Sequence, residues 1–270
     1  MRVDAEADAA FLGPSLAADL GRRAGVRPSA APRSVLFQPD LSGLAVISEG
    51  VPERAVAVDA GGCRSALALA PAADGYQLVA VPLAAAEAGR DLTRPVASMD
   101  GGAVEPLGGA LSVDDLTRWQ AFALALTCAD LVGTMRGATE LACGYAKIRH
   151  QYGVPIGSFQ SLQHLLADAY VATEGSTSVA RYAAWAADNL AAEEALTAAA
   201  VAKAYCARAG RAVCESAIQV HGGIGNTWDC LAHVYLRRAL LSIQLLGDAG
   251  VNLARVMRHH GIGGVHSGLR

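Results

Sequence analysis

The fold is decided by one stretch of the sequence, residues 116–150, which reads LTRWQAFALALTCADLVGTMRGATELACGYAKIRH. The stretch contains no proline and is rich in Ala and Leu, two residues with high helix propensity. Just before it, Ser112 and Asp115 have the spacing of a capping box, in which two side chains bond the backbone of the first helical turn. The sequence therefore predicts one unusually long helix that begins near residue 112.

A second long helix is expected after a sharp turn. Glycine and proline at positions 153, 155 and 157 predict the turn, and Ser158 is expected to cap a helix over residues 159–192. Apolar residues near the start of this helix recur at the spacing of one helical face. They are Leu162, Leu165, Leu166 and Tyr170.

Two more helical stretches follow. One is expected from about residue 194 to 220 and ends at Gly222 and Gly223, with His221 in its last turn. The other is expected from 231 to about 260, with an interruption near Gly247. Four long helices joined by short turns predict an up-down four-helix bundle over residues 111–262, followed by a tail over 263–270.

The sequence before the bundle has a different pattern. Short β-prone runs separated by Gly, Pro and Asp recur between residues 33 and 110, and they predict a small antiparallel β domain. Asp74–Gly75 is a hairpin signal between two of these runs, and residues 91–110 are expected to form exit loops. Residues 1–32 predict one or two short helices. The β-prone runs are residues 35–37, 44–47, 55–58, 66–69 and 78–81.

Composition excludes several classes of protein. Hydrophobic residues make up 53% of the chain and charged residues 17%, which excludes disorder over most of it. The net charge of −3 gives no general basic field for nucleic acid or an anionic membrane. The longest apolar stretch is broken by Asp130 and is short for a membrane span, and the N-terminus carries acids where a signal peptide carries cations. The six cysteines lack metal-ligand spacing, so we expect a reduced, cytoplasmic protein without structural metal.

One candidate binding segment is KIRHQYGVPIGSFQ, residues 147–160. It brings a cation (Arg149), an amide, an aromatic ring and the start of a helix within a few residues. A cation beside free backbone N–H groups is an arrangement that binds phosphate. The alternative is that Arg149 only stabilises the C-terminal end of the preceding helix through the helix dipole.

The second candidate segment is QVHGGIGN, residues 219–226. Three glycines in four positions remove side chains where the backbone must approach another group closely. The segment follows a helix and not a strand, so it is not the glycine-rich fingerprint of a dinucleotide-binding fold. The alternative is a glycine C-cap followed by a loose turn, with His221 packed or hydrogen-bonded and not acting as an acid or base.

Together, and in this order, the two segments resemble the C-terminal domain of the acyl-CoA dehydrogenase family. Further matches at residues 166–168, 227–228 and 235–239 extend the resemblance over about residues 110–260. It implies that the segments bind the diphosphate and adenine of FAD across a subunit interface, while the flavin ring lies in the neighbouring subunit. The implied cofactor-binding residues are Arg149, Gln151, Tyr152, Phe159, Gln160, Gln219, Val220, His221, Gly222 and Gly223.

The sequence also departs from the family's pattern. Residues 1–32 would be a remnant of its N-terminal helical domain, and the β region lacks the Gly-Ser-Asp loop and Thr-rich strand that cradle the flavin ring. The family's catalytic base is a glutamate at one of two places, which correspond here to Leu246 and Ala123. Neither side chain can accept a proton. The nearest carboxylates are Asp248, two residues away from the first position, and Asp130, two helical turns away from the second, so no catalytic residue is assigned.

These losses are similar to those of the short, degenerate subunit of α2β2 acyl-CoA dehydrogenases, such as the pairs of actinobacterial steroid side-chain degradation. The resemblance implies an FAD-dependent enzyme that introduces an α,β double bond into an acyl-CoA thioester. A full-length partner subunit would supply the base and the flavin-ring pocket and bind most of the acyl-CoA, and electron-transfer flavoprotein would accept the electrons. Two alternatives stay open: a self-sufficient homo-oligomer that uses Asp248 or Asp130 as its base, and a flavin-free helical scaffold.

Overall fold

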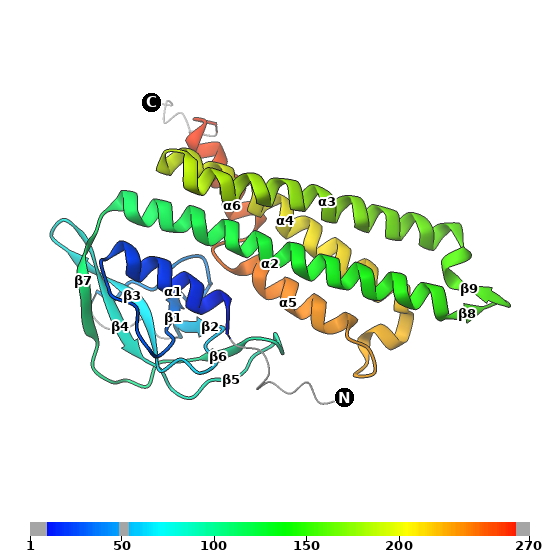
Figure 1. Ribbon diagram of the computed structural model, residues 1–270, viewed down its shortest axis with the longest axis horizontal. Coiled ribbons are helices and arrows are strands. Elements are labelled where there is room, and N and C mark those ends of the chain that lie inside the picture. Colours follow the sequence, from blue (N-terminus) through cyan, green and yellow to red (C-terminus); the bar gives the residue numbers. More distant parts are fainter. Residues whose placement is uncertain (1–9, 49–53, 263–270) are drawn as a thin grey trace, which may run out of the picture.

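A seven-stranded sheet lies at one end of a bundle of long helices, and a short hairpin lies at the other end (Figure 1). The structure is a computed structural model and describes residues 10–48 and 54–262. Along the chain, one helix is followed by the strands of the sheet and then by the long helices. This order confirms the expected class, which is mainly helical with a small β domain and a C-terminal helical bundle.

Helix α2 (Val113–Ile148) is the longest element and begins where the sequence predicts. The Ser112 side chain accepts the N–H of Asp115, and the Asp115 carboxylate accepts the N–H of Ser112, so the capping box is present. By length and composition alone, α2 contains a window long and apolar enough for a membrane span, so the expectation that this stretch is too short was wrong. However, 61% of its most apolar window is buried inside the structure, as in the core helix of a folded bundle.

The remaining long helices complete the bundle. Helices α3 (Gln160–Asn189) and α4 (Ala192–His221) pack on α2 and on each other. Helices α5 (Ala232–Gln244) and α6 (Ala249–His259) supply the fourth position, and they are separated near Gly247, as predicted. Many positions between the helices are fully buried alanines, which allow the helix axes to approach closely.

Two expectations about the start of α3 are wrong. Ser158 does not cap the helix, because the chain first makes a 3-10 turn, η1 (Ile156–Ser158), and the Ser158 hydroxyl donates to the Pro155 carbonyl. Phe159 takes the N-cap position and provides no side-chain hydrogen bond. Tyr170 does not share the buried stripe, because 61% of it is exposed, whereas the three leucines of the stripe pack against the core.

Seven strands form the main sheet. They are β1 (Ser34–Phe37), β2 (Val56–Val58), β3 (Ser65–Ala72), β4 (Gly75–Pro82), β5 (Glu87–Ala88), β6 (Pro95–Ala97) and β7 (Glu105–Leu111). Their spatial order is β5-β6-β2-β1-β3-β4-β7. The hairpin predicted at Asp74–Gly75 joins β3 and β4 and is confirmed. Strands β1 and β3 are parallel, however, so the expectation of a purely antiparallel sheet is wrong.

Two β-prone or loop regions differ from expectation. Residues 44–47 form only isolated bridges, in which Leu44 pairs with Phe37 and Val46 pairs with Leu69. Residues 91–110 are more than exit loops, because they contain β6 and most of β7, which pair with β2 and β4. Whether each of these segments forms a strand depends on partner strands that are distant in the sequence, because β propensity depends strongly on the neighbours of a strand.

Helix α1 (Leu12–Arg23) covers the sheet beside α2 (Figure 1). Its own N-cap residue provides no side-chain bond. Instead the Asp59 carboxylate, from the end of β2, accepts three backbone N–H groups, those of residues 11–13. The indole Nε1 of Trp119 on α2 donates to the carbonyl of Leu16 at 3.0 Å. These bonds tie α1 both to the sheet and to the bundle, and its apolar face enters the common core.

Candidate cofactor site

A pocket of about 340 Å³ lies at the end of the bundle that is remote from the sheet. It is formed where α2 ends, where the hairpin of β8 (His150–Gln151) and β9 (Val154–Pro155) turns, and where α3 begins and α4 ends. Arg149 and Gln219 are seventy positions apart in the sequence, and the packing of the helices brings their segments to the same pocket. The predicted residues that line the pocket are Arg149, Gln151, Tyr152, Phe159, Gln219, Val220, His221 and Gly222.

Two aromatic side chains line the pocket, one on the hairpin turn and one at the N-cap of α3. Tyr152 and Gly153 both have positive φ, 53° and 80°, which is the backbone of a tight two-residue hairpin turn. A non-glycine residue is uncommon there, and Tyr152 is 92% exposed. Its ring meets that of Phe159 edge-on, with the centroids 6.2 Å apart. The turn therefore presents an apolar ring to any group that enters the pocket.

Arg149 supplies the cation of the pocket. It is the C-cap of α2, its N–H donates to the Tyr145 carbonyl, and its own carbonyl accepts the N–H of Ile156 at 2.8 Å. The backbone is thus fixed while the side chain is exposed. Among the residues that the structure describes, no carboxylate pairs with this guanidinium. The C-cap position also agrees with the alternative, in which Arg149 interacts with the helix dipole.

His221 has a packing role. Its Nδ1 lies 2.7 Å from the Ala217 carbonyl oxygen, and because that oxygen only accepts, Nδ1 carries the hydrogen. The ring stacks on Tyr145 with the centroids 4.5 Å apart, and the residue is buried. This agrees with the expectation of a packed, hydrogen-bonded histidine.

The glycines that follow α4 have different structural reasons. Gly222 ends the helix with a φ of +64°, a conformation that favours glycine. Gly225 is packed, because a Cβ there would lie 3.0 Å from the Ile218 carbonyl oxygen. Gly223 has neither constraint: its φ is not positive, and an added Cβ would meet no atom within 4 Å. The open space beside Gly222 and Gly223 is available to a ligand.

Two of the predicted residues lie outside the pocket lining. Gln160 is exposed at the first position of α3, and Gly223 is exposed in the short 3-10 helix η2 (Gly222–Asn226). Both are next to residues that do line it. The pocket otherwise fits one end of a dinucleotide, because it combines an exposed cation, aromatic rings and side-chain-free backbone in a volume near the lower limit of ligand sites. Within residues 10–48 and 54–262, no cluster of three His, Cys, Asp or Glu is placed to hold a metal ion.

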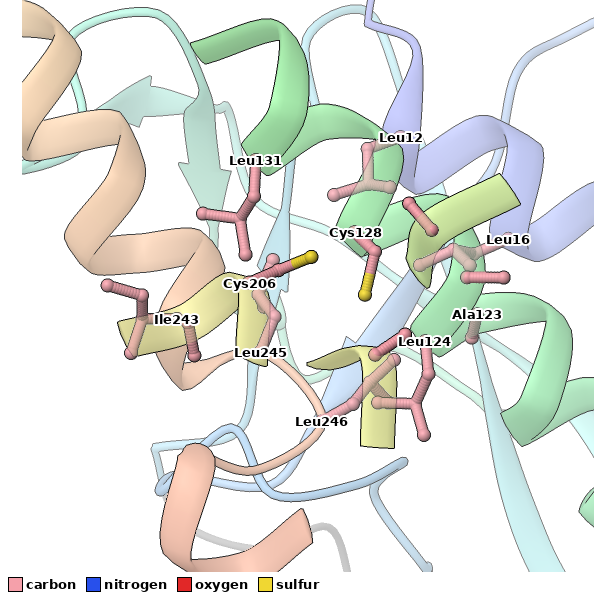
Figure 2. Packing of buried hydrophobic residues seen from close by; sticks show 14 of the residues in the cluster. Leu12, Leu16, Ala123, Leu124, Cys128, Leu131, Cys206, Ile243, Leu245 and Leu246 are labelled. Atoms are coloured by element: carbon pink, nitrogen blue, oxygen red, sulfur yellow. The ribbon is translucent and has the colours of Figure 1, made fainter. Parts of the chain in front are cut away.

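The two positions that correspond to the family's base are buried in the core. Ala123 and Leu246 are both fully buried and belong to one apolar cluster with Leu12 and Leu16 of α1 (Figure 2). Leu246 adopts a φ of +63°, and its N–H donates to the Leu41 carbonyl at 2.7 Å. Figure 2 shows both side chains packed among the apolar residues of this cluster. The geometry therefore gives neither position a means of removing a proton.

The two alternative carboxylates have structural partners. Asp130 pairs with Arg94 and Arg238 and accepts a hydrogen bond from Ser242 at 2.7 Å. Burial alone would raise the pKa of Asp130, but the two guanidinium groups outweigh burial and hold the pKa below its usual value. Asp248 is exposed and caps α6, where its Oδ1 accepts the N–H of Val251. Both carboxylates thus have structural roles: Asp130 forms ion pairs, and Asp248 caps a helix.

Sequence reasoning missed the buried polar residues that join the elements. Lys203 on α4 is fully buried, and its ammonium donates to the carbonyls of Ile243, Leu245 and Gly247 at 2.8–2.9 Å. Burial lowers the pKa of Lys203 to about 8. The sequence feature that could have identified Lys203 is the presence of a lysine in an alanine-rich helix. Arg94 had no signal, because its partners lie in other elements.

Comparisons with known proteins identify the family of the helical bundle. Residues 122–260 match the family model described as "Acyl-CoA dehydrogenase, C-terminal domain". The acyl-CoA dehydrogenase IpdE2 of Mycolicibacterium smegmatis is 36% identical over 166 residues, which is 62% of this chain and 49% of that protein. The chain thus spans about half the length of this relative.

Solved structures share the fold. The "Tcur3481-Tcur3483 steroid ACAD G363A variant" superposes with a TM-score of 0.73 and 25% identity, over 86% of this chain and 68% of that one. The ChsE4-ChsE5 complex from Mycobacterium tuberculosis gives a TM-score of 0.73 at 22% identity, over 93% of this chain and 75% of that one. The family model covers half of the sequence and includes both candidate binding segments. This chain belongs to the acyl-CoA dehydrogenase family.

Proposed function

We propose that this chain is a non-catalytic subunit of a heteromeric, FAD-dependent acyl-CoA dehydrogenase. It would contribute the adenosine-diphosphate site, while a full-length partner supplies the catalytic base and the pocket for the flavin ring. The observation that carries the proposal is a contrast within one chain. Eight of the ten predicted nucleotide-binding residues line an open pocket, whereas both positions of the family's base are apolar and buried.

The residues of the pocket are suited to the nucleotide half of FAD. Arg149 would pair with the diphosphate through charge-assisted hydrogen bonds. Gln219 and the backbone at Gly222 and Gly223 would hold the adenosine, and the exposed Tyr152 ring would pack on it. When bound, FAD accepts the two electrons removed from the substrate; the residues of this chain would bind and orient it.

The position of the pocket favours a partner. The β8–β9 hairpin, which contributes to its lining, lies at the end of the bundle far from the sheet (Figure 1). The pocket volume of about 340 Å³ is near the lower limit of ligand sites. A complete FAD would therefore extend beyond this chain. A second subunit that covers the rim would enclose the rest of the cofactor.

The substrate proposal rests on relatives. Because a structure described as a steroid ACAD shares 25% identity and the fold, we assign the enzyme an acyl-CoA thioester of a steroid side chain. The partner would bind most of that substrate, since the apolar core of this chain is filled around Ala123 and Leu246. Electron-transfer flavoprotein would be the acceptor, and the reaction would take place in the cytoplasm.

Co-expression tests the proposal. The chain is produced alone and together with a full-length acyl-CoA dehydrogenase from the same organism, and size and flavin content are measured. We expect an α2β2 complex that holds flavin, and no flavin in the chain alone. The Asp248→Asn variant, which alters an exposed helix cap, should leave the activity of the complex unchanged.

Two results would contradict the proposal. A yellow, active homo-oligomer of this chain would support the self-sufficient enzyme. A stable complex whose flavin content does not depend on Arg149 would favour the scaffold.

A further inference from the structure

A cleft larger than the candidate cofactor pocket lies between the sheet and the bundle. It has a volume of about 880 Å³ and is bounded by β2 and β6 on one side and by α5 and the end of α4 on the other. None of its lining residues belongs to the candidate cofactor pocket. A cleft of this size between two layers is in the range that holds a small organic ligand.

The inner surface of the cleft is apolar. Aliphatic side chains come from four elements, β2, β6, α4 and α5, so the apolar surface is not confined to one face of the cleft. Leu240 is 40% exposed, although it is a large apolar residue on a short helix. The aliphatic lining residues are Val56, Val96, Ile218, Leu236, Leu240 and Leu241.

The rim of the cleft is cationic. Arg90 and Arg237 are both exposed there, and the Arg237 guanidinium is held in place by a hydrogen bond to the Arg90 carbonyl at 3.2 Å. Within the described residues, neither guanidinium pairs with a carboxylate. The acidic residue of the lining, Asp91, is buried, accepts hydrogen bonds from Thr93 through Oδ1, and has its Oδ2 3.8 Å from the Arg94 guanidinium.

An exposed aromatic side chain completes the mouth of the cleft. Trp228 is 73% exposed, and its ring meets His233 edge-on with the centroids 5.0 Å apart. The bundle core does not use this ring, and neither does the candidate cofactor pocket. An indole beside two guanidinium groups is suited to cover the apolar body of a ligand whose charged end binds the arginines.

We propose that this cleft binds an apolar carboxylate, a molecule with a bulky hydrocarbon body and one acidic group. The body would occupy the aliphatic interior, and the carboxylate would pair with Arg237 and Arg90 at the rim. A bidentate guanidinium–carboxylate pair gives the site its preference for an acid over a neutral analogue. This inference rests on the cleft alone and is independent of the proposed function.

Binding to cholate tests the proposal. Cholate is a rigid polycyclic carboxylate, methyl cholate is its uncharged ester, and acetate is a carboxylate without the body. Each is titrated below micelle-forming concentrations into the full chain, followed by calorimetry and by Trp fluorescence. Cholate should bind at least tenfold more tightly than either analogue, and the Trp228→Phe variant should lose the fluorescence change.

Matched variants separate this site from non-specific binding. Arg237→Gln should weaken cholate binding about tenfold, because one charge-assisted contact is lost, and Arg237→Lys should restore part of it. Arg181→Gln, an exposed arginine on α3, should have no effect. Equal binding of cholate and methyl cholate, or equal losses in the Arg237 and Arg181 variants, would overturn the proposal.

Discussion

The buried ammonium of Lys203 donates a hydrogen bond to the carbonyl oxygen of Gly247, 2.9 Å away, and so joins α4 to the linker between α5 and α6. The carbonyls of Leu245 in the same linker and of Ile243 in the last turn of α5 also accept from this ammonium. The linker includes Leu246, whose positive φ is unusual for a buried leucine. A strained backbone persists when its surroundings fix it. Lys203 does so here together with the buried Asn252, whose amide donates to the carbonyls of Gly247 and Asp248 at 2.9 Å.

Replacing Lys203 with methionine should destabilise the protein. The methionine side chain fills a similar volume but removes the ammonium donor from three buried carbonyls, at an expected cost of about 2–4 kcal/mol. The Gly247 carbonyl keeps a second donor in Asn252. Chemical denaturation measures the change in the free energy of unfolding. Lys147→Met, at an exposed position near the end of α2, is the matched control and should change stability by less than about 0.5 kcal/mol. Equal effects of the two substitutions would show that the ammonium does not fix the linker.

Stability in acid should depend on Asp130. Its pKa is lower in the folded protein than in the unfolded chain, so the unfolded chain binds the proton more readily. The contribution of Asp130 is therefore complete above the unfolded value of 3.8 and declines as the pH falls below it. At neutral pH, Asp130→Asn should cost about 3–5 kcal/mol, because it leaves the buried Arg94 with only the more distant carboxylate of Asp91, 3.8 Å away.

The pH profile distinguishes this role from simple packing. The stability difference between the wild type and Asp130→Asn should shrink as the pH is lowered from 5 to 3. Asp114→Asn breaks an exposed pair with Arg118 and should cost at most about 1 kcal/mol. If the Asp130→Asn difference is the same at pH 3 and pH 7, the ion pairs do not stabilise the fold.

The helices were predictable because their signals are local. The Ser112–Asp115 capping box lies next to the helix it begins, and the Gly222 backbone ends α4 directly after its last periodic residue. The hairpin at Asp74–Gly75 is equally local. The parallel pairing of β1 with β3 was not predictable, since it depends on which strands meet after a long connection.

The residues of the candidate site and of its supporting structure also differ in whether their signals are local. Arg149 and Gln219 were identified from their own segments, and the bundle then brought these segments to one pocket. Asp59 and Lys203 were missed because each one bonds backbone groups forty or more positions away. Ser158 was misassigned because a serine before a helix is a common N-cap, while here a 3-10 turn precedes the helix.

Arg149→Ala should lower flavin occupancy of the complex without unfolding the helices. The side chain is exposed and bonds no other residue that the structure describes, so its loss removes only ligand contacts. Charge-assisted hydrogen bonds contribute about 1.5–3 kcal/mol, which predicts a tenfold to hundredfold weaker affinity for FAD. Flavin absorbance after dialysis measures the effect, and Arg181→Ala is the control on α3. Unchanged flavin content would leave Arg149 with its interaction with the helix dipole alone.

Gly223→Val should abolish FAD binding while the fold is retained. The backbone at Gly223 has no positive φ, and the space beside it is open, so valine should cost less than about 1 kcal/mol of stability. If the adenosine diphosphate lies against this backbone, however, the branched side chain takes its place. Gly223→Ala should give an intermediate loss, because it adds only the first carbon.

Gly144→Val is the matched control for this prediction. Gly144 also has open space for a Cβ and no positive φ, but it lies on α2 outside the lining of the candidate cofactor pocket. Each complex is purified, its helicity and subunit ratio are checked, and the flavin absorbance per heterodimer is read. Gly144→Val should keep its flavin, and Gly223→Val should lose it at an equal melting temperature. Full flavin in both variants would mean that no ligand approaches Gly223, and that the glycines after α4 serve only to end the helix and to pack the turn.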